Sequence, residues 1–343
     1  MKKRIVDTLK ILFFLSLGAF FIWLFMHNLT PEEKKEIYNS LISANYWWLA
    51  LSIMLGLTSH LSRAARWNIL IEPMGYKPRL RTTFFAVMIG YLANLALPRL
   101  GEVSRCGVLA RYEKIPLQKG FGTVITERTI DLISLGLAFL INFIIHIDKF
   151  KLFQETRVIQ NIIGKYQQLE NPGIIYWIFF GIIALLIFIF YRARHKIEHT
   201  KFYQKIKEII LGFLEGIKSL TKIKKPFWFI FHSIFIWILY LMMSWVVFNS
   251  IDETRGLSLG IGLAVLVFGS IGIVVVQGGI GIYPWIVAEI LALYHVPEVK
   301  GYALGWLLWI GQTLTIVIVG ILSLTLLPVL NRNKNEFSQP DPE

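Results

Sequence analysis

The sequence predicts an all-α polytopic membrane protein with about six full crossings and two inverted re-entrant hairpins of broken helices. Of its 343 residues, 55% are hydrophobic and 17% are charged, whereas a soluble domain carries about 25% charged residues. Apolar runs of about 20 residues, the length that spans a bilayer, recur along the chain. Two of these runs are interrupted by proline or glycine motifs, which lipid tolerates only where protein or a wet cavity satisfies the backbone.

The charge and cysteine content exclude several classes of protein. The formal net charge is +13, but most lysines and arginines flank apolar runs, so the positive-inside rule explains them better than nucleic-acid binding does. The one cysteine, Cys106, excludes a disulfide within the chain and a zinc–thiolate cluster. No Walker loop or Ser-His-Asp arrangement is visible in the sequence, and we expect no cofactor, metal site or catalytic residue.

The first two apolar runs predict a cytoplasmic N-terminus. Residues 11–26 follow a basic start and lack a small-residue cleavage site, so we expect a retained helix rather than a signal peptide. A second helix is predicted over residues 47–61, ending just before Arg63 and Arg66. We interpret these arginines as a positive-inside anchor at the cytoplasmic surface. The alternative is an entrance that attracts lipid headgroups.

The first hairpin follows this basic loop. An apolar run, residues 84–97, ends at Pro98-Arg99-Leu100-Gly101, and a basic segment comes next. A complete crossing would place that basic segment outside, against the charge rule, so we expect the chain to fold back at the break. Residues 120–147 are then predicted to span the membrane, with three charged residues inside the helix.

The middle of the chain is predicted to contain one segment on the outer membrane surface and one on the cytoplasmic surface. Residues 148–171 fit the outer surface, and residues 173–191 are expected to cross back. The basic segment 192–225 has apolar residues at helical spacing, which predicts an amphipathic cytoplasmic linker that lies on anionic headgroups.

The last third of the chain repeats the order of elements predicted for the first third. Residues 227–248 are predicted to cross outward, and the run 257–276 is broken by a motif that contains Gly278-Gly279-Ile280-Gly281. A last helix, residues 301–327, returns to the cytoplasm. Residues 331–343 form a polar tail that we expect to be disordered. Because the last helix ends in the cytoplasm, both termini are expected to be cytoplasmic.

We expect a single transmembrane domain, residues 1–330, whose two halves resemble each other in short sequence motifs and in the order of their helices. The segment 115–120, Ile-Pro-Leu-Gln-Lys-Gly, matches the segment 296–301, Val-Pro-Glu-Val-Lys-Gly, and each opens a long helix after a hairpin. The first unit, about 47–147, enters its hairpin from inside, and the second, about 226–327, enters from outside. This predicts an inverted repeat whose broken helices meet near mid-membrane, as in many secondary transporters.

Charged residues at membrane depth usually face a cavity or one another. Glu127 and Asp131 share a helix face, and Arg128 has the i,i+3 spacing to pair with Asp131; Glu102 and Arg105 have the same spacing on the hairpin. Arginine is well suited to bind phosphate because its planar guanidinium group can donate two parallel hydrogen bonds to it. We therefore expect a site for a lipid phosphate, a salt-bridge cluster that pins the hairpin to the helix, or both together, with Glu102 in a positioning role and an arginine binding the phosphate. The residues of this candidate substrate site are Arg63, Arg66, Asn94, Arg99, Glu102, Arg105, Glu127, Arg128, Asp131, Gly278, Gly279 and Gly281.

Two kinds of uncharged residue belong to this candidate site. Asn94 stands four residues before Pro98, where its side chain can cap backbone groups that the break frees; a plain interhelical hydrogen bond is the alternative. The three glycines permit close backbone approach and unusual dihedral angles, although glycine is also common in tight helix packing.

The string Gly90-x3-Asn94-x3-Pro98-Arg99-Leu100-Gly101-Glu102-x2-Arg105, with Glu127-Arg128-x2-Asp131 and Gly-Gly-Ile-Gly after it, resembles the flippase-like family. That family is similar to the membrane domain of bacterial lysylphosphatidylglycerol synthase. The resemblance covers about residues 11–330 and implies an integral membrane protein related to a domain that moves phospholipid between leaflets.

Two features depart from that family. Only a short tail follows the last helix, in place of the aminoacyl-transferring domain of the synthase, so we do not expect synthase activity. Tyr283-Pro284 stands where family members often carry an Arg-Glu pair, which leaves the identity of the headgroup open.

These observations predict a translocator of a phospholipid or lipid-linked substrate in a bacterial inner membrane, with the headgroup in an arginine- and carboxylate-lined cavity. The expected partners are that lipid and anionic headgroups at the linker, and a second copy of the chain or an envelope enzyme are further candidates. Two alternative functions stay open: an intramembrane enzyme that acts on a lipid substrate, and a non-transporting scaffold for an envelope enzyme.

Overall fold

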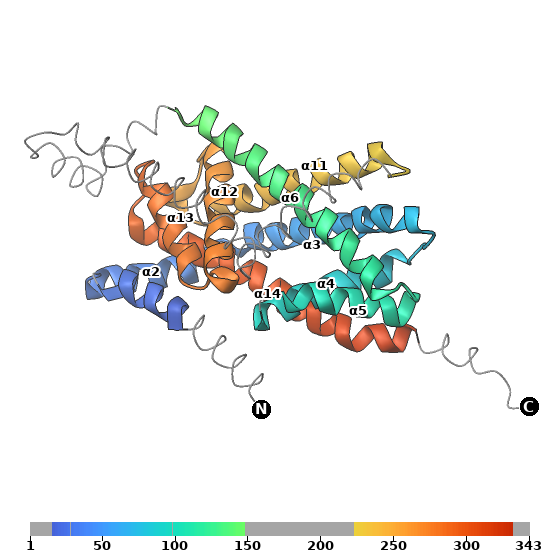
Figure 1. The fold of residues 1–343 in the computed structure, drawn as a ribbon. Coiled ribbons are helices and arrows are strands. Elements are labelled where there is room, and N and C mark those ends of the chain that lie inside the picture. Colours follow the sequence, from blue (N-terminus) through green and yellow to red (C-terminus); the bar gives the residue numbers. More distant parts are fainter. Residues whose placement is uncertain (1–15, 28, 98, 148–222, 332–343) are drawn as a thin grey trace, which may run out of the picture.

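The prediction of an all-α protein is confirmed for the residues that the computed structural model describes, which are 16–27, 29–97, 99–147 and 223–331 (Figure 1). In chain order, the helices after an N-terminal helix at Ser16–His27 are α2 (Pro31–Ser43), α3 (Tyr46–Ile71), α4 (Leu80–Ala96), α5 (Leu100–Glu113), α6 (Leu117–Ile145), α11 (Pro226–Val246), α12 (Leu259–Val275), α13 (Ile282–Ala292) and α14 (Glu298–Leu330). Short 3-10 turns join them at η1 (Glu72–Met74), η2 (Val247–Ser250), η3 (Asp252–Thr254) and η4 (Gln277–Gly279).

Within these ranges, three helices are long and apolar enough to span a membrane: α6, α11 with its extension to Ser250, and α14. A fourth span is formed if α2 and α3, which meet at a bend of 68°, are counted together. The predicted crossing at 173–191, most of the basic linker and the tail from residue 332 lie outside the described residues. The structure therefore supports several crossings, and the count of six stays a prediction.

Large apolar side chains cover the outside of the long helices, as lipid contact requires. Many of these residues are exposed in the isolated chain, and a soluble monomer rarely shows apolar patches of this extent. Examples on α6, α11 and α14 are Leu140, Ile144, Ile230, Ile234, Ile318 and Leu322.

Helix α3 is longer than the sequence predicted. It begins after Asn45, whose side chain caps the backbone N–H of Trp47 at 3.1 Å, and continues to Ile71. Arg63 and Arg66 therefore lie inside the helix rather than in a loop beyond it, and both are buried. The interpretation of these arginines as a surface anchor is wrong, because both side chains are buried and acidic groups on α6, the buried Glu127 and the partly buried Asp131, compensate their charges.

Each half of the chain contains a pair of packed helices followed by one long helix. In the first half, α5 packs along α4 after a break at 97–99, and α6 follows. In the second half, α13 packs on α12 after a break at Val276–Gly281, and α14 follows. Gly278, Gly279 and Gly281 have φ of 72°, 70° and 76°, a left-handed conformation that glycine adopts without steric cost.

The joint before each long helix has the same local geometry in both halves. Lys114 and His295 are left-handed, with φ of 58° and 64°. Two residues later, Pro116 (φ −56°, ψ 137°) and Pro297 (φ −55°, ψ 134°) cap α6 and α14. The sequence match between these segments is therefore accompanied by matching backbone geometry.

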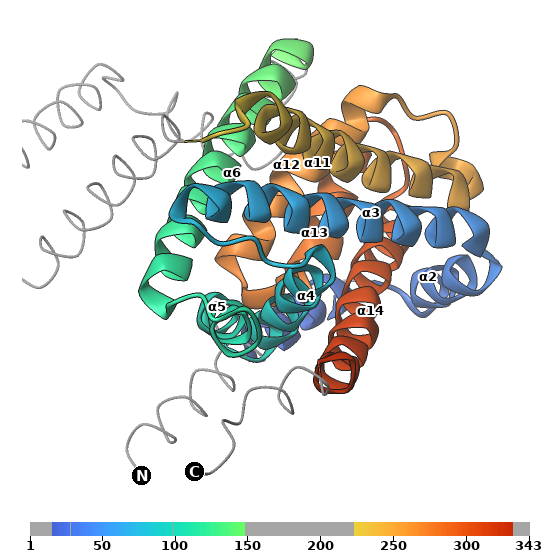
Figure 2. The same ribbon diagram turned by 90° about the vertical axis from the view of Figure 1, so that its right-hand side faces the viewer.

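The two halves are interleaved rather than separate. Helices α3 and α11 run side by side across the molecule (Figure 2). Helix α14 packs on α4 of the other half, and α6 packs on α12. The two breaks also approach each other, since a Cβ atom on Gly278 would lie 3.8 Å from the side chain of Leu95, just before the first break.

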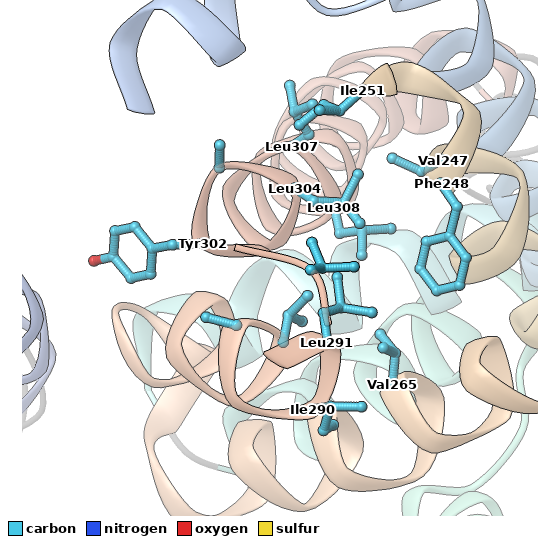
Figure 3. Packing of buried hydrophobic residues seen from close by; sticks show 14 of the residues in the cluster. Val247, Phe248, Ile251, Val265, Ile290, Leu291, Tyr302, Leu304, Leu307 and Leu308 are labelled. Carbon is cyan, nitrogen blue, oxygen red and sulfur yellow. The ribbon is translucent and has the colours of Figure 1, made fainter. Parts of the chain in front are cut away.

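The largest core cluster fixes the second half around α14. Figure 3 shows its buried side chains packed between α14, α13, α12 and η2. Members of this cluster include Phe248, Val265, Leu291, Leu304 and Leu308. A second cluster surrounds Trp67 of α3 and joins it to α4, α5 and α6.

Candidate functional site

Four arginines and three carboxylates come together around α6 and form what we call the ionic cluster. Its members are Arg63, Arg66, Glu102, Arg105, Glu127, Arg128 and Asp131. They come from α3, α5 and α6, which lie far apart in the sequence. Among the residues that the structure describes, one positive charge is in excess, because four guanidinium groups face three carboxylates.

The centre of the cluster joins α3 to α6. Arg63 donates from Nη1 to Glu127 Oε1 at 2.7 Å and to Asp131 Oδ2 at 2.6 Å. Arg66 donates to Asp131 Oδ1 at 2.7 Å and lies 3.4 Å from Glu127 Oε1. Glu127 and Asp131 are four residues apart and lie on one face of α6, and Arg63 and Arg66 are three residues apart and lie on one face of α3. This part of the cluster holds two long helices together.

Arg105 of α5 attaches the first helix pair to the same centre. Its Nη1 lies 2.8 Å from Glu127 Oε2, and its guanidinium carbon stands 4.7 Å from the centre of the Trp67 ring. The Trp67 indole donates to Thr123 Oγ1 at 2.8 Å. The salt-bridge interpretation of the sequence therefore describes Arg105 and Glu127 well, because both are buried and fix α5 to α6.

Arg128 occupies a different environment. It donates to Glu102 Oε1 at 2.8 Å, and the side chains of Arg128 and Glu102 remain 47% and 21% exposed. The expected pair along the helix between Arg128 and Asp131 is replaced by this contact, because Asp131 turns toward Arg63 and Arg66. Arg128 thus keeps an accessible guanidinium at the edge of the cluster.

Asn94 caps the helix that follows the first break. Its Oδ1 accepts a hydrogen bond from the backbone N–H of Gly101 at 2.7 Å, one of the N–H groups that the start of α5 leaves without a helical partner. Gly101 is buried against Gly90, and a Cβ atom there would collide with the Gly90 carbonyl. The interpretation of Asn94 as a cap for freed backbone is confirmed.

A cavity of about 310 Å³ opens between the two halves beside the ionic cluster. Arg63 and Arg128 reach it from the cluster, and the rest of its wall comes from α3, α4, α11, α12, α13 and α14. The polar residues of this wall, beside the two arginines, are Ser52, His60, Tyr91, Tyr240, Ser244, Ser270, Tyr283, Gln312 and Thr315. We call this space the central cavity.

The structure separates the predicted site residues of the cavity, the cluster and the two breaks into four groups. Arg63 and Arg128 line the central cavity, whereas Arg66, Arg105 and Glu127 are buried in the cluster beside it. Arg99 is exposed at the first break, where it has φ of 65°. The three glycines form the second break, and the Gly278 carbonyl accepts a hydrogen bond from Trp309 Nε1 at 2.7 Å.

The uncharged wall of the cavity was not predicted from the sequence. A signal was present in α3, where Ser52, Gly56, His60 and Arg63 recur at spacings of four, four and three and so share one face of an apolar helix. The contributions of α11, α12 and α14 had no comparable signal, because single serine and threonine residues are common in membrane helices. Among the described residues, no group of three or more histidine, cysteine or acidic side chains is arranged to hold a metal ion.

The sequence profile of the family described as "Lysylphosphatidylglycerol synthase TM region" matches residues 8–329. A protein of Methanocaldococcus jannaschii, described as a UPF0104 membrane protein, is 25% identical over 234 residues, which are 62% of this chain and 67% of that protein. No solved structure matches the chain significantly.

Proposed function

Because this chain belongs to the lysylphosphatidylglycerol synthase transmembrane-region family, and is therefore a membrane protein, we propose that it moves the headgroup of a phospholipid or lipid-linked substrate across the bilayer. The observation that carries this proposal is the central cavity, which Arg63 and Arg128 line beside a cluster with one excess positive charge. A guanidinium group binds phosphate strongly, and a partly enclosed site strengthens that attraction.

The proposed path uses the two broken helix pairs. We regard α4–α5 and α12–α13 as re-entrant hairpins of an inverted repeat, within a domain of six crossings in an inner membrane with cytoplasmic termini. The matching joints at Pro116 and Pro297 support the repeat, and the approach of Gly278 to Leu95 supports a meeting of the hairpin tips. The headgroup would pass between the halves while the acyl chains remain in lipid.

Arg128 is the residue proposed to receive the phosphate. Its side chain is 47% exposed and has one carboxylate partner, Glu102, whereas Arg63 already contacts two carboxylates and Tyr240. The carboxylates of the cluster are all engaged by arginines, and this favours transport over an enzyme that needs a free carboxylate as general base.

The test is lipid movement in sealed proteoliposomes. Wild-type protein is reconstituted with phospholipids labelled on the acyl chain, and the labelled lipid in the outer leaflet is followed after a membrane-impermeant quencher is added. We expect protein-dependent movement that Arg128→Gln reduces at least about tenfold, the loss of one charge-assisted hydrogen-bonded contact.

Arg111→Gln is the matched control. Arg111 is an exposed arginine on α5 that does not line the central cavity, so its replacement removes the same charge and should leave movement near the wild-type rate. Equal rates for Arg128→Gln and wild type would contradict the proposed role of Arg128. Absence of movement for every lipid, from folded protein, would contradict the proposed function.

A further inference from the structure

The central cavity has an unbalanced set of charges. Its wall contains Arg63 and Arg128 and, among the described residues, no aspartate or glutamate. The carboxylates of the ionic cluster lie behind these arginines rather than in the wall. A headgroup that carries an amine would therefore bring its positive charge into a cavity whose wall has two guanidinium groups and no carboxylate, beside a cluster with one excess positive charge, which is unfavourable at short range.

The hydroxyl groups of the wall are arranged to accept hydrogen bonds. Ser244, Ser270 and Thr315 each donate to a backbone carbonyl of their own helix, at 3.3, 2.6 and 2.7 Å, and Ser52 donates to the Met243 carbonyl of α11 at 3.0 Å. Since each hydroxyl has one proton and two lone pairs, its oxygen remains available as an acceptor. Ligand hydroxyl groups match such a wall.

His60 adds a buried polar atom with no partner in the described part of the chain. The residue is 9% exposed, lines the cavity and stands against Tyr91 with ring centres 4.8 Å apart. Its Nδ1 makes no hydrogen bond there. Buried polar atoms are normally paired, so this nitrogen indicates a polar ligand or a water molecule in the cavity.

The size of the cavity limits the ligand. A volume of about 310 Å³ lies at the lower end of the range for small-molecule sites, about 300 to 1,000 Å³. Such a space holds one small headgroup, but not an oligosaccharide or the acyl chains.

On the basis of the proposed function, we infer that the transported lipid has an anionic headgroup with one phosphate and a short polyhydroxyl group, and no amine. Phosphoglycerol is the simplest headgroup of this class. The phosphate contacts Arg128 and approaches Arg63, and the ligand hydroxyl groups donate to serine and threonine oxygens of the cavity wall. His60 completes the polar contacts.

One alternative uses the tyrosines of the wall. Tyr91, Tyr240 and Tyr283 line the cavity, and aromatic rings can hold a quaternary ammonium group through cation–π contacts. The two arginines oppose this arrangement, since the ammonium would share the cavity with their charges. Phosphatidylcholine is therefore included in the test.

The experiment compares acyl-labelled phosphatidylglycerol, phosphatidic acid, phosphatidylethanolamine and phosphatidylcholine in the same proteoliposomes. We expect phosphatidylglycerol to move fastest, at least about tenfold faster than phosphatidylethanolamine and phosphatidylcholine, whose headgroups carry a positive charge, because like charges in a shared site are strongly disfavoured. Phosphatidic acid has the phosphate without the hydroxyl groups, so it should move more slowly than phosphatidylglycerol.

A charge switch in the wall tests the reasoning directly. Gln312→Glu adds a carboxylate to the cavity with almost no change of shape, and it should lower the ratio of phosphatidylglycerol to phosphatidylethanolamine movement about tenfold. The matched variant Gln312→Leu removes the amide without adding charge and should keep the wild-type preference. A ratio that Gln312→Glu does not change would overturn the inference.

The remaining outcomes separate the inference from the proposed function. Equal movement of phosphatidylglycerol and phosphatidylethanolamine, or preference for phosphatidylcholine, overturns the headgroup inference and leaves transport intact. If no lipid moves, transport fails, and thermal unfolding in detergent decides the chemistry of the site. Glycerol 3-phosphate should then raise the melting temperature more than phosphoethanolamine or inorganic phosphate does, and equal effects of the three would overturn the inference.

Discussion

Replacement of Glu127 by glutamine should loosen the attachment of α5 to α6. Glu127 is fully buried and contacts Arg63, Arg66 and Arg105 at 2.7, 3.4 and 2.8 Å. Arg63 and Arg66 keep Asp131 as a partner in the variant, but Arg105 has no other carboxylate partner in the described part of the chain. Its guanidinium would remain buried and uncompensated, since it is 5% exposed and its Nε and Nη2 already lack hydrogen bonds.

The expected cost is large. Breaking a buried ion pair by removing one partner costs about 3–5 kcal/mol, against a total stability of about 5–15 kcal/mol for a typical protein. At 1.4 kcal/mol per factor of ten, the equilibrium for opening α5 should rise by roughly two to three and a half powers of ten. The change is local, because the first core cluster around α14 does not involve these residues.

Cys106 provides the assay. It is the one cysteine of the chain, it is buried, and it follows Arg105 directly on α5. A thiol-reactive fluorophore in detergent should therefore label it only when α5 opens, at a rate that follows the opening equilibrium when closing is fast. We expect labelling of Glu127→Gln to be at least about a hundredfold faster than that of the wild type.

Two further variants make the test specific. Adding Arg105→Met to Glu127→Gln removes the uncompensated charge and should slow labelling again, because apolar replacement of a buried pair is often neutral. Glu102→Gln breaks the more exposed pair with Arg128 and should change labelling less than about fivefold, since such pairs contribute about 0–1 kcal/mol. A labelling rate of Glu127→Gln equal to that of the wild type would refute the reasoning.

Three other predictions concern the hairpin and one surface contact. Asn94→Ala removes the cap on the Gly101 N–H and should cost about 0.5–2 kcal/mol, measured as faster thiol labelling, while Asn94→Asp keeps an acceptor and most of the stability. Gly101→Ala should block the close approach of α5 to a carbonyl of α4, and thermal unfolding should show a lower melting temperature than for Gly107→Ala, whose Cβ atom meets open space. The hydrogen bond from Lys300 lowers the pKa of the Glu253 carboxyl, so its contribution to stability is complete above the ordinary carboxyl pKa and is lost as the pH falls through the lowered value. Acid unfolding followed by tryptophan fluorescence should therefore be less steep for Glu253→Gln, and identical profiles would count against this contact.

The sequence predicted the class of protein and the positions of its breaks. Apolar runs and interrupting glycines determine where helices form and end, because helix formation in lipid is a local response to composition and backbone freedom. Asn94 could be interpreted correctly for the same reason, since its partner Gly101 is only seven residues away. The repeated joints before α6 and α14 were also visible as short matching segments.

The sequence could not determine which charges pair. Arg63 and Arg66 looked like surface anchors because their partners are more than 60 residues away in the sequence, and spacing along one helix suggested the wrong partner for Arg128. Most of the wall of the central cavity was also hidden, because it combines one to three polar residues from each of seven helices and only α3 shows them as a pattern along one face. The local sequence determines which segments enter the membrane and where the backbone breaks, whereas only the packing of α3, α5 and α6 decides which guanidinium groups are neutralised and which still face the cavity.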